Sequence, residues 1–356
     1  MGFIVNPILA IERERERIMI HLILCGGHGR RLWPLSNDES PKSFLKFSSQ
    51  PSMFQQTILR NRLLCDKTVV VANERHSSLA IGQAEEIQCG HIEFLWESSA
   101  RDTAAAIALA CFGLQPDEIV LVTPSDHWID QQEEYDKAVE RATEIAKQNY
   151  LAAISIRPTR PYEGYGYILA EGEDVISFCE KPRVDQAVEF LKKSNWFWNS
   201  GIYCFKAGVL LEELRNHSPS IWESSNRVYE KQIVRSSNQF SYPDMDCIPE
   251  ESIDRAVFQK STRLKMVLLQ TGWSDIGTLE DLAEYFRQSA VMSSEKPGIF
   301  QFQSSNNVFL SDSVPVALID VEDLIIVASK NGILISKRGS SHKVKHVFNQ
   351  FNLSQR

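Results

Sequence analysis

The sequence predicts an α/β fold with a mostly parallel sheet, followed by a small C-terminal β appendage. The α/β part is indicated by short apolar runs that alternate with segments of helical period. The appendage is indicated by a change of pattern after residue 297, where the apolar runs shorten and turn residues divide them. The predicted division is a peripheral N-terminal extension over 1–17, a large domain over 18–290 and a small β domain over 297–356.

Five apolar runs in the first half are predicted to be buried strands. A helix is expected between the last two, because apolar residues from 135 to 146 recur at i, i+3, i+4 and i+7. Asp130 followed by Glu133 suggests a capping pair at its start. Such alternation implies right-handed crossovers, with ligands at the carboxyl ends of the strands. The expected strands are 18–25, 68–72, 92–96, 119–123 and 151–156.

The pattern changes after residue 164, where shorter strands surround a short helix over 184–193. We expect a mixed extension of the sheet that serves as a lid or as a platform for a second substrate. Helical segments over 207–258, a strand over 264–270 and a helix over 279–288 complete the large domain. The remaining expected strands are 167–170, 175–180 and 201–205 in the extension, and 307–310, 314–320, 324–328 and 333–336 in the appendage.

Composition excludes several classes of protein. The formal net charge of -8 over 356 residues argues against nucleic acid as a partner, since phosphate backbones need a basic face. No apolar run approaches the roughly 20 residues that span a bilayer, so no membrane association is expected. The seven cysteines are scattered without a C-x-x-C pair, which suggests reduced thiols in a cytoplasmic protein. Cys25, Cys111 and Cys204 are expected to be small core residues.

A glycine-rich, cationic loop follows the first predicted strand. It reads Gly26-Gly27-His28-Gly29-Arg30-Arg31-Leu32-Trp33-Pro34-Leu35, with Pro41-Lys42 behind it. Glycines free the backbone to turn and to present N–H groups to an anion, while Arg31 and Lys42 add positive charge. The dinucleotide fingerprint is excluded because Leu32 stands where its third glycine belongs, and the Gly-Lys-Ser/Thr of the Walker loop is absent.

Two aspartates are candidate metal ligands. Asp126 follows the strand at 119–123 in Thr123-Pro124-Ser125-Asp126-His127, and Asp275 lies in Gly272-Trp273-Ser274-Asp275-Ile276-Gly277. Mg²⁺ commonly takes one or two carboxylates and completes its shell with water and phosphate oxygens. Each aspartate alone could instead be a helix cap or an Asx turn. For His127 we expect a packing or hydrogen-bonding role, because a hard cation favours oxygen.

Together these motifs resemble the sugar-1-phosphate nucleotidyltransferases, and the Leu32-Trp33-Pro34-Leu35 version of the loop looks most like the mannose-1-phosphate guanylyltransferase branch. The resemblance runs from about residue 18 to 334 and includes three further segments. They are Glu97-Ser98-Ser99-Ala100-Arg101-Asp102-Thr103-Ala104, Phe178-Cys179-Glu180-Lys181-Pro182 and Trp198-Asn199-Ser200-Gly201. It implies a Rossmann-like nucleotidyltransferase domain and an Mg²⁺-dependent enzyme that converts GTP and mannose 1-phosphate into GDP-mannose and pyrophosphate.

The resemblance also implies roles for single residues. Arg31, Lys42 and Lys181 would be catalytic cations, and Asp126 and Asp275 would hold the metal. The sugar phosphate would be bound by Gly166, Glu180, Lys181 and Asn199. Nucleotide binding falls to Leu24, Gly26, Gly27, Gly29, Arg30, Arg101, Asp102 and Thr103, of which Asp102 also suits a helix cap.

Some alternatives stay open. Asp102 stands where the family usually has Asn, and Ala105 replaces a usual Pro, so another base is possible. The sugar could be a heptose, fucose or glucose phosphate. A catalytically silent homologue acting as a regulatory subunit is the alternative from a different class. Bifunctional relatives carry an additional isomerase domain after this point, so transferase activity only is expected. A homodimer through the β appendage is a further expectation.

Overall fold

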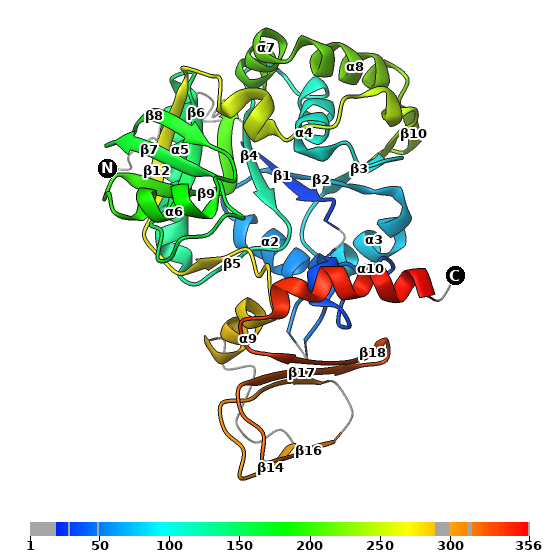
Figure 1. The fold of residues 1–356 in the computed structure, drawn as a ribbon. Coiled ribbons are helices and arrows are strands. Elements are labelled where there is room, and N and C mark those ends of the chain that lie inside the picture. Colours follow the sequence, from blue (N-terminus) through cyan, green and yellow to red (C-terminus); the bar gives the residue numbers. More distant parts are fainter. Residues whose placement is uncertain (1–18, 28, 48–49, 289–298, 312–314, 355–356) are drawn as a thin grey trace, which may run out of the picture.

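The computed structural model describes residues 19–27, 29–47, 50–288, 299–311 and 315–354 (Figure 1). The predicted extension over 1–17 lies outside the described residues. One sheet of eleven strands runs through the large domain in the order β10-β11-β3-β2-β1-β4-β9-β6-β12-β8-β7. The α/β fold class is therefore confirmed.

The first half of this sheet is parallel, as predicted. Each strand pairs in parallel with its neighbours in the order β3-β2-β1-β4, and β6 pairs in parallel with β12. Helices cover both faces, so these strands are buried on both sides and their sequences read as continuous apolar runs. Their bounds are β1 (Met19–Cys25), β2 (Lys67–Asn73), β3 (Ile92–Glu97), β4 (Ile119–Pro124), β6 (Leu151–Ile156) and β12 (Leu264–Leu269).

A long strand, β9 (Trp196–Lys206), makes the whole sheet mixed. It lies between β4 and β6 and runs antiparallel to both. With β7 (Tyr167–Glu171), β8 (Asp174–Cys179) and α6 (Val184–Leu191) it forms the predicted mixed extension. The predicted start of this strand at residue 201 was wrong, because Asn199 and Ser200 also lie within β9. The register shifts here, and Gly201 has a φ of 75°, so this part of β9 is a β-bulge.

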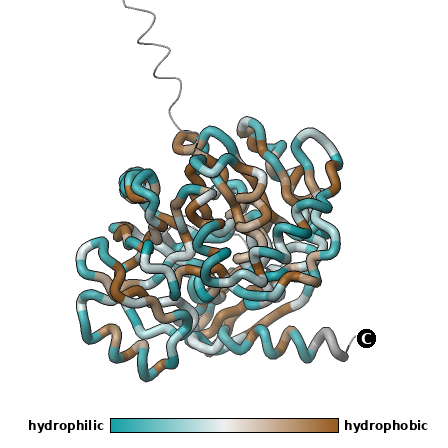
Figure 2. Tube along the Cα trace, turned by 90° about the horizontal axis from the view of Figure 1, so that it is seen from above, coloured by the Kyte–Doolittle hydropathy of each residue, from teal (hydrophilic) through white to brown (hydrophobic). Residues whose placement is uncertain are grey.

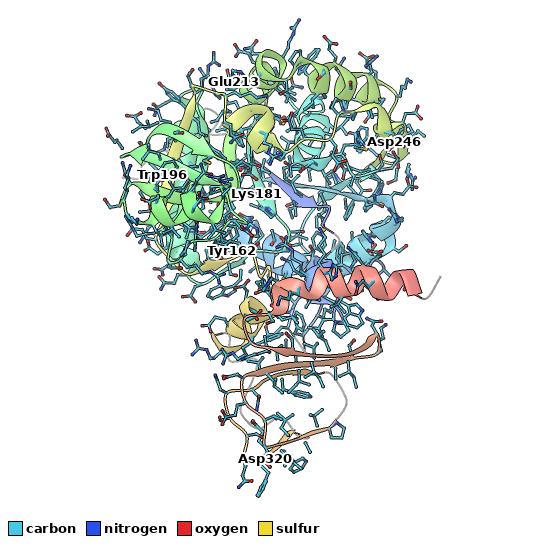
Figure 3. All side chains as sticks on the ribbon, in the orientation of Figure 1. Tyr162, Lys181, Trp196, Glu213, Asp246 and Asp320 are labelled. Atoms are coloured by element: carbon cyan, nitrogen blue, oxygen red, sulfur yellow. The ribbon has the colours of Figure 1, made fainter. Side chains whose placement is uncertain are left out.

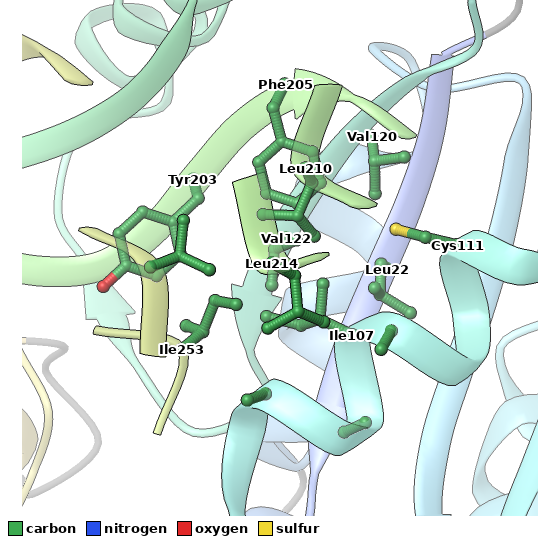
Figure 4. Packing of buried hydrophobic residues seen from close by; sticks show 14 of the residues in the cluster. Leu22, Ile107, Cys111, Val120, Val122, Tyr203, Phe205, Leu210, Leu214 and Ile253 are labelled. Carbon is green, nitrogen blue, oxygen red and sulfur yellow. The ribbon is translucent and has the colours of Figure 1, made fainter. Parts of the chain in front are cut away.

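Alternate residues of the central strands point to different helices. Leu22 packs in one core with Ile107 of α4 and Leu210 of α7, as Figure 4 shows, whereas Ile23 packs in another core with Phe54 of α2. One face is thus covered by α4 (Asp102–Phe112), α7 (Ala207–His217) and α8 (Pro219–Glu230), and the other by α2 (Met53–Asn61), α3 (Ser77–Glu86) and α5 (Gln132–Lys147).

Hydrophobic stretches gather in the interior of the trace and hydrophilic turns surround them (Figure 2). Cys25, Cys111 and Cys204 are buried, as predicted. The predicted cap of α5 was wrong. The N-cap residue is Gln131, and its side chain makes no capping hydrogen bond. The N–H of Asp130 instead donates to the Gly272 carbonyl, next to the paired strands β5 (Trp128–Ile129) and β13 (Trp273–Ser274).

The helical segment predicted over 207–258 also contains an unpredicted hairpin and a short π-helix. The hairpin consists of β10 (Ile233–Ser236) and β11 (Gln239–Tyr242), and β11 extends the sheet beside β3. The π-helix spans Asp254–Phe258. α9 (Leu279–Gln288) has the predicted bounds.

The β appendage consists of short paired strands followed by a helix. β14 pairs in parallel with β16, and β17 pairs in parallel with β15 and antiparallel with β18. Figure 1 shows α10 between the large domain and the β17–β18 pair. Neither β14 nor α10 was predicted. The bounds are β14 (Ile299–Phe302), β15 (Val308–Ser311), β16 (Val316–Ile319), β17 (Leu324–Ser329), β18 (Gly332–Lys337) and α10 (Val344–Ser354).

Candidate functional site

A central cavity collects residues from both halves of the chain. It lies where the carboxyl ends of β1 and β4 face the loop after β13. Arg31, Lys42, Asp126 and Asp275 all line it, so the structure brings these predicted residues together in one cleft. The full lining is Gly27, Gly29, Arg31, Leu32, Lys42, Asp126, His127, Asp275, Ile276, Gly277 and Lys345.

The glycine-rich loop folds back over the segment that carries Lys42. Gly29 has a φ of 62° and precedes the 3-10 helix at Arg30–Leu32. A Cβ atom at Gly29 would lie 2.7 Å from the backbone N of Lys42 and 2.8 Å from its Cβ. Only glycine fits this close approach and this backbone conformation. Arg30 lies in the same turn, but its side chain is outside the described part of the structure.

Lys42 connects the two aspartates. Its side chain is 9% exposed, and its Nζ lies 2.5 Å from Asp126 Oδ2. The same Nζ donates to the backbone carbonyl oxygen of Asp275 at 2.5 Å. Burial alone would raise the pKa of Asp126, but the attraction of Lys42 outweighs it and holds that pKa below its ordinary value. Asp126 is therefore ionised at neutral pH.

The carboxylate of Asp275 is held by donors on its other side. Its Oδ1 accepts from the Tyr165 hydroxyl at 2.6 Å and from the N–H of Gly277 at 3.2 Å. A Cβ atom at Gly277 would lie 3.4 Å from an Arg31 guanidinium nitrogen and 3.0 Å from Asp275 Oδ2. Glycine at 277 therefore leaves room for Arg31 beside the second carboxylate oxygen.

His127 has the packing role that the sequence suggested. Its Nδ1 accepts from Trp273 Nε1 at 3.3 Å, and the two rings meet edge to face with centroids 5.2 Å apart. Burial lowers the pKa of His127 to about 4, so the ring is neutral at pH 7.

An adjoining cavity shares Gly27 and Asp126 with the central one. Six of the eight predicted nucleotide-binding residues line it: Leu24, Gly26, Gly27, Arg101, Asp102 and Thr103. Gly29 lines the central cavity instead. Several of these side chains are also held by the fold. Arg101 Nε donates to the Ile248 carbonyl at 2.6 Å, and the Thr103 hydroxyl accepts from the N–H of Ile253 at 2.9 Å.

The expectation that Asp102 caps α4 was wrong in detail. Arg101 occupies the N-cap position, and Asp102 is the first helical residue, with a φ of 61°. Its Oδ1 accepts from the N–H of the next residue, Thr103, at 2.7 Å. This local contact replaces a bond to the later N–H groups of the first turn.

Glu97 is a residue of the adjoining cavity that the sequence did not mark for any role. It ends β3 and is 5% exposed, and its Oε1 is buried without a hydrogen-bond partner among the described residues. Burial, with a smaller contribution from Asp102, raises the pKa of Glu97 to about 8. A buried, unpartnered carboxyl is costly unless a ligand satisfies it. The sequence signal that could have identified Glu97 is an acidic residue at the end of a predicted buried strand.

The four residues predicted to bind the sugar phosphate form a second cluster. The Gly166 carbonyl accepts from the N–H of Asn199 at 2.8 Å, and a Cβ atom at Gly166 would lie 2.7 Å from Glu180 Oε2. Glu180 Oε1 lies 3.1 Å from Lys181 Nζ. None of these four residues lines either cavity. In the view of Figure 3, Lys181 lies on the side of the β7–β9 lobe that faces β1.

Asp254 belongs to this cluster and was not predicted from the sequence. Asn199 Nδ2 donates to Asp254 Oδ1 at 2.8 Å and to the Tyr203 hydroxyl at 2.7 Å, and that hydroxyl also bonds Asp254. Burial, and then repulsion by Glu180, raises the pKa of Asp254 to about 6. The cluster is linked to the central cavity, because Gly166 follows Tyr165, whose hydroxyl donates to Asp275. The bulge at Gly201 also faces Pro124. A Cβ atom at Gly201 would lie 3.5 Å from Pro124 Cγ.

The two aspartates have the chemistry of a magnesium site. No group of three His, Cys, Asp or Glu side chains suited to a metal occurs in the described ranges. Two carboxylates in a cavity with phosphate-binding cations nevertheless fit Mg²⁺, since water and phosphate oxygens supply its other ligands.

Within the described residues, no helix combines the length and the apolar character needed to cross a membrane.

Comparisons with known proteins agree with this geometry. A family model described as nucleotidyl transferase matches residues 20–291, and one described as MannoseP isomerase/GMP-like β-helix domain matches residues 300–351. Mannose-1-phosphate guanylyltransferase 2 of Escherichia coli O157:H7 is 34% identical over 363 residues, which cover 95% of this chain and 74% of that relative.

Two solved structures are also similar. One, described as a mannose-1-phosphate geranyltransferase from Thermus thermophilus, has a TM-score of 0.78 at 26% identity and covers 94% of this chain and 99% of its own. The other, described as mannose-6-phosphate isomerase from Helicobacter pylori, has a TM-score of 0.66 at 33% identity and covers 72% of this chain and 99% of its own. The chain belongs to the nucleotidyl transferase family, and its C-terminal part is a β-helix domain of the MannoseP isomerase/GMP-like type.

Proposed function

We propose that this protein transfers a guanylyl group from GTP to mannose 1-phosphate, giving GDP-mannose and pyrophosphate with Mg²⁺ as the cofactor. The observation that carries the proposal is the central cavity, in which the cations Arg31 and Lys42 meet the carboxylates Asp126 and Asp275. The guanylyltransferase name of the Escherichia coli relative supports it. The names of that relative and of the two solved structures all include a mannose phosphate.

The reaction is an in-line displacement at phosphorus. An oxygen of the sugar phosphate forms a bond to the α-phosphorus of the nucleotide, and the bond from that phosphorus to the bridging oxygen breaks. Pyrophosphate leaves with the electron pair. Both reactants are anions, so positioning and charge neutralisation account for most of the catalysis.

Arg31 and Lys42 are placed for this neutralisation. Arg31 can fork two phosphate oxygens, whereas Lys42 is a compact charge that also fixes both aspartate loops. Asp126 and Asp275 would hold Mg²⁺, which neutralises phosphate charge when bound. Lys181 would hold the sugar phosphate, with Gly166, Glu180 and Asn199 around the sugar.

Guanine is favoured by the carboxyl of Glu97. Guanine presents N–H groups on its Watson–Crick edge, including the N2 amino group that other bases lack at this place. Glu97 Oε1 is an acceptor without a partner among the described residues, and Glu97 lines the adjoining cavity. Adenine presents an acceptor at N1 and only one N–H group on that edge, so of the two purines guanine alone supplies two N–H groups to Glu97, which gives up its own proton when guanine binds.

A panel assay tests the proposal. Purified protein with Mg²⁺ is incubated with GTP, ATP, CTP, UTP or dTTP, each crossed with mannose, glucose, fucose and heptose 1-phosphates, and pyrophosphate release is measured. We expect the highest kcat/KM for GTP with mannose 1-phosphate, and loss of turnover with EDTA. If no pair of nucleotide and sugar 1-phosphate releases pyrophosphate, the protein is not this enzyme, and a silent regulatory homologue is favoured. Isomerisation of mannose 6-phosphate is measured with the same protein. If it occurs, the expectation that the protein has transferase activity only is rejected.

We further propose a cytoplasmic location, because scattered cysteines without a pairing pattern are typical of a reducing compartment.

A further inference from the structure

We infer that Lys345, in the C-terminal helix α10, binds the phosphates of the nucleotide donor and the pyrophosphate that leaves. The β-helix domain would then supply part of the active site. The inference rests on the proposed function for the identity of the ligand, whereas the geometry stands by itself. Lys345 lines the central cavity with Arg31 and Lys42, although more than 300 residues separate it from both in the sequence.

The charge of Lys345 is available for a ligand. The residue is exposed, and among the residues that the structure describes no carboxylate lies within ion-pair distance of its ammonium. Lys42, by contrast, is already engaged by Asp126 and by the Asp275 carbonyl. Among the described residues, the central cavity therefore offers two cations that form no ion pair within 4.0 Å, Arg31 and Lys345, for the phosphates. Two carboxylates in the same cavity make a further cation valuable.

The core beneath α10 fixes the position of Lys345. Val344 is 3% exposed and Phe348 is 4% exposed, and both belong to a core that includes Leu32 and Ile276. Leu32 directly follows Arg31 in the chain, and Ile276 directly follows Asp275. The buried side of α10 thus packs on the two loops that carry Arg31 and Asp275.

Polar contacts hold the same domain to the glycine-rich loop. The Pro34 carbonyl accepts from the Ser329 hydroxyl at 2.7 Å and from Asn331 Nδ2 at 3.0 Å. A Cβ atom at Gly332 would lie 3.2 Å from the indole of Trp33, so the β17–β18 turn is in close contact with the loop. The N–H of Gly339 donates to Glu280 Oε1, at 2.8 Å, on α9. These contacts hold the domain that carries α10 against the glycine-rich loop and α9.

The test compares Lys345→Ala with Lys343→Ala, a matched control. Lys343 is an exposed lysine two positions earlier, and it does not line the central cavity. Inorganic pyrophosphate is titrated into each full-length protein with Mg²⁺ by calorimetry, and steady-state constants are measured for GTP and mannose 1-phosphate. For Lys345→Ala we expect the pyrophosphate Kd and the GTP KM to rise about tenfold, the value expected for a hydrogen bond to a charged group. The mannose 1-phosphate KM should stay within about twofold.

Two further variants guard against a merely structural effect. Lys345→Arg should restore pyrophosphate binding to within about threefold of wild type, whereas Lys345→Glu should weaken it more than Lys345→Ala. The thermal midpoints of all variants should match that of wild type. An unchanged pyrophosphate Kd in Lys345→Ala, or equal changes in Lys343→Ala, would overturn the inference, as would a wild-type protein that binds no pyrophosphate.

The titration also separates this inference from the proposed function. If no nucleotide and sugar phosphate pair turns over, but pyrophosphate binds and depends on Lys345, the proposed function fails and the phosphate site remains. If GDP-mannose forms and pyrophosphate binding is indifferent to Lys345, only the inference fails.

Discussion

The hydroxyl of Tyr165 donates to Asp275 Oδ1 at 2.6 Å, across 110 positions of the chain. Burial, together with the charge of Asp275, raises the pKa of Tyr165, so the hydroxyl stays protonated and remains a donor. The contact orients one proposed metal ligand from the lobe that carries the proposed sugar cluster. This hydrogen bond therefore connects the two proposed substrate regions.

Tyr165→Phe should raise the Mg²⁺ concentration for half-maximal activity about tenfold, because groups that orient a metal ligand typically change metal affinity by about 10–100-fold. The measurement is activity against Mg²⁺ concentration at saturating GTP and mannose 1-phosphate. Tyr162→Phe is the control, since the Tyr162 ring packs on Tyr165 with centroids 4.5 Å apart but does not bond Asp275. Equal Mg²⁺ dependence in both variants would remove Tyr165 from the metal site.

Lys42→Ala should lower kcat by about 10²-fold or more, the scale of a lost electrostatic stabiliser. The reason is twofold: the variant removes a cation from the central cavity and releases the two aspartate loops that Lys42 joins. Single-turnover kinetics at saturating substrates measures the effect. Lys46→Ala is the matched control, because Lys46 pairs with Glu86 at the surface. Activity within a few fold of wild type in Lys42→Ala would contradict the assigned role.

Much of the central cavity could be predicted because its residues follow strands. The glycine-rich loop comes after β1, and Asp126 comes after β4, which pairs with β1 in parallel. Parallel neighbours end at the same sheet edge, so the meeting of Gly27 with Asp126 follows from topology. The position of Asp275 depended on the resemblance to the family, since β13 has only two residues.

Other parts depended on long-range packing that short patterns do not show. Asn199 reads as part of a turn, yet it lies in a bulge of β9, held between β4 and β6. Asp254, which bonds Asn199, lies 55 positions later in the π-helix, so short patterns do not show the pair. α10 carried a detectable signal, since Val344, Val347, Phe348 and Phe351 have the spacing i, i+3, i+4 and i+7. Only strands were predicted in this domain, so Lys345 was missed.

Glu97→Gln should reduce the preference for GTP over ATP by about 10–100-fold, in line with the loss of a well-oriented base contact of about 1–3 kcal/mol. An amide offers one acceptor oxygen and adds N–H donors, which cannot satisfy the N–H groups of guanine as a carboxylate does. The ratio of kcat/KM for GTP to that for ATP is the measurement. Glu93→Gln, on the same strand but outside the adjoining cavity, should leave the ratio unchanged. An unaltered ratio in Glu97→Gln would remove Glu97 from base recognition.

Asn199→Ala should mainly raise the KM for mannose 1-phosphate, by about tenfold, with a small effect on the KM for GTP. The change removes the amide that bonds Asp254 and Tyr203, and it leaves the Asp254 carboxyl short of a partner. Asn195→Ala, just before β9, is a control outside the cluster. Should the two variants give the same sugar phosphate KM, Asn199 would not belong to the sugar site.

The folding free energy should depend on pH through Glu97. Its pKa of about 8 in the folded protein exceeds the ordinary value of 4.5, so the native state holds a proton that the unfolded chain releases between these values. The stabilisation from this protonation is fully present below about pH 4.5 and is lost as the pH rises to about 8. Within this window Glu97 contributes a slope of at most about 1.4 kcal/mol per pH unit.

Urea unfolding of wild type and Glu97→Gln at about pH 5, 6, 7 and 8 isolates this contribution. Asp254, whose pKa is raised to about 6, titrates in the same window but is present in both proteins, so its effect cancels in the difference. The amide of glutamine does not titrate, so the variant should gain stability relative to wild type as the pH rises. Parallel curves for the two proteins would show that the Glu97 carboxyl is already ionised in the native state, and the base site would then bind guanine without releasing or taking up a proton.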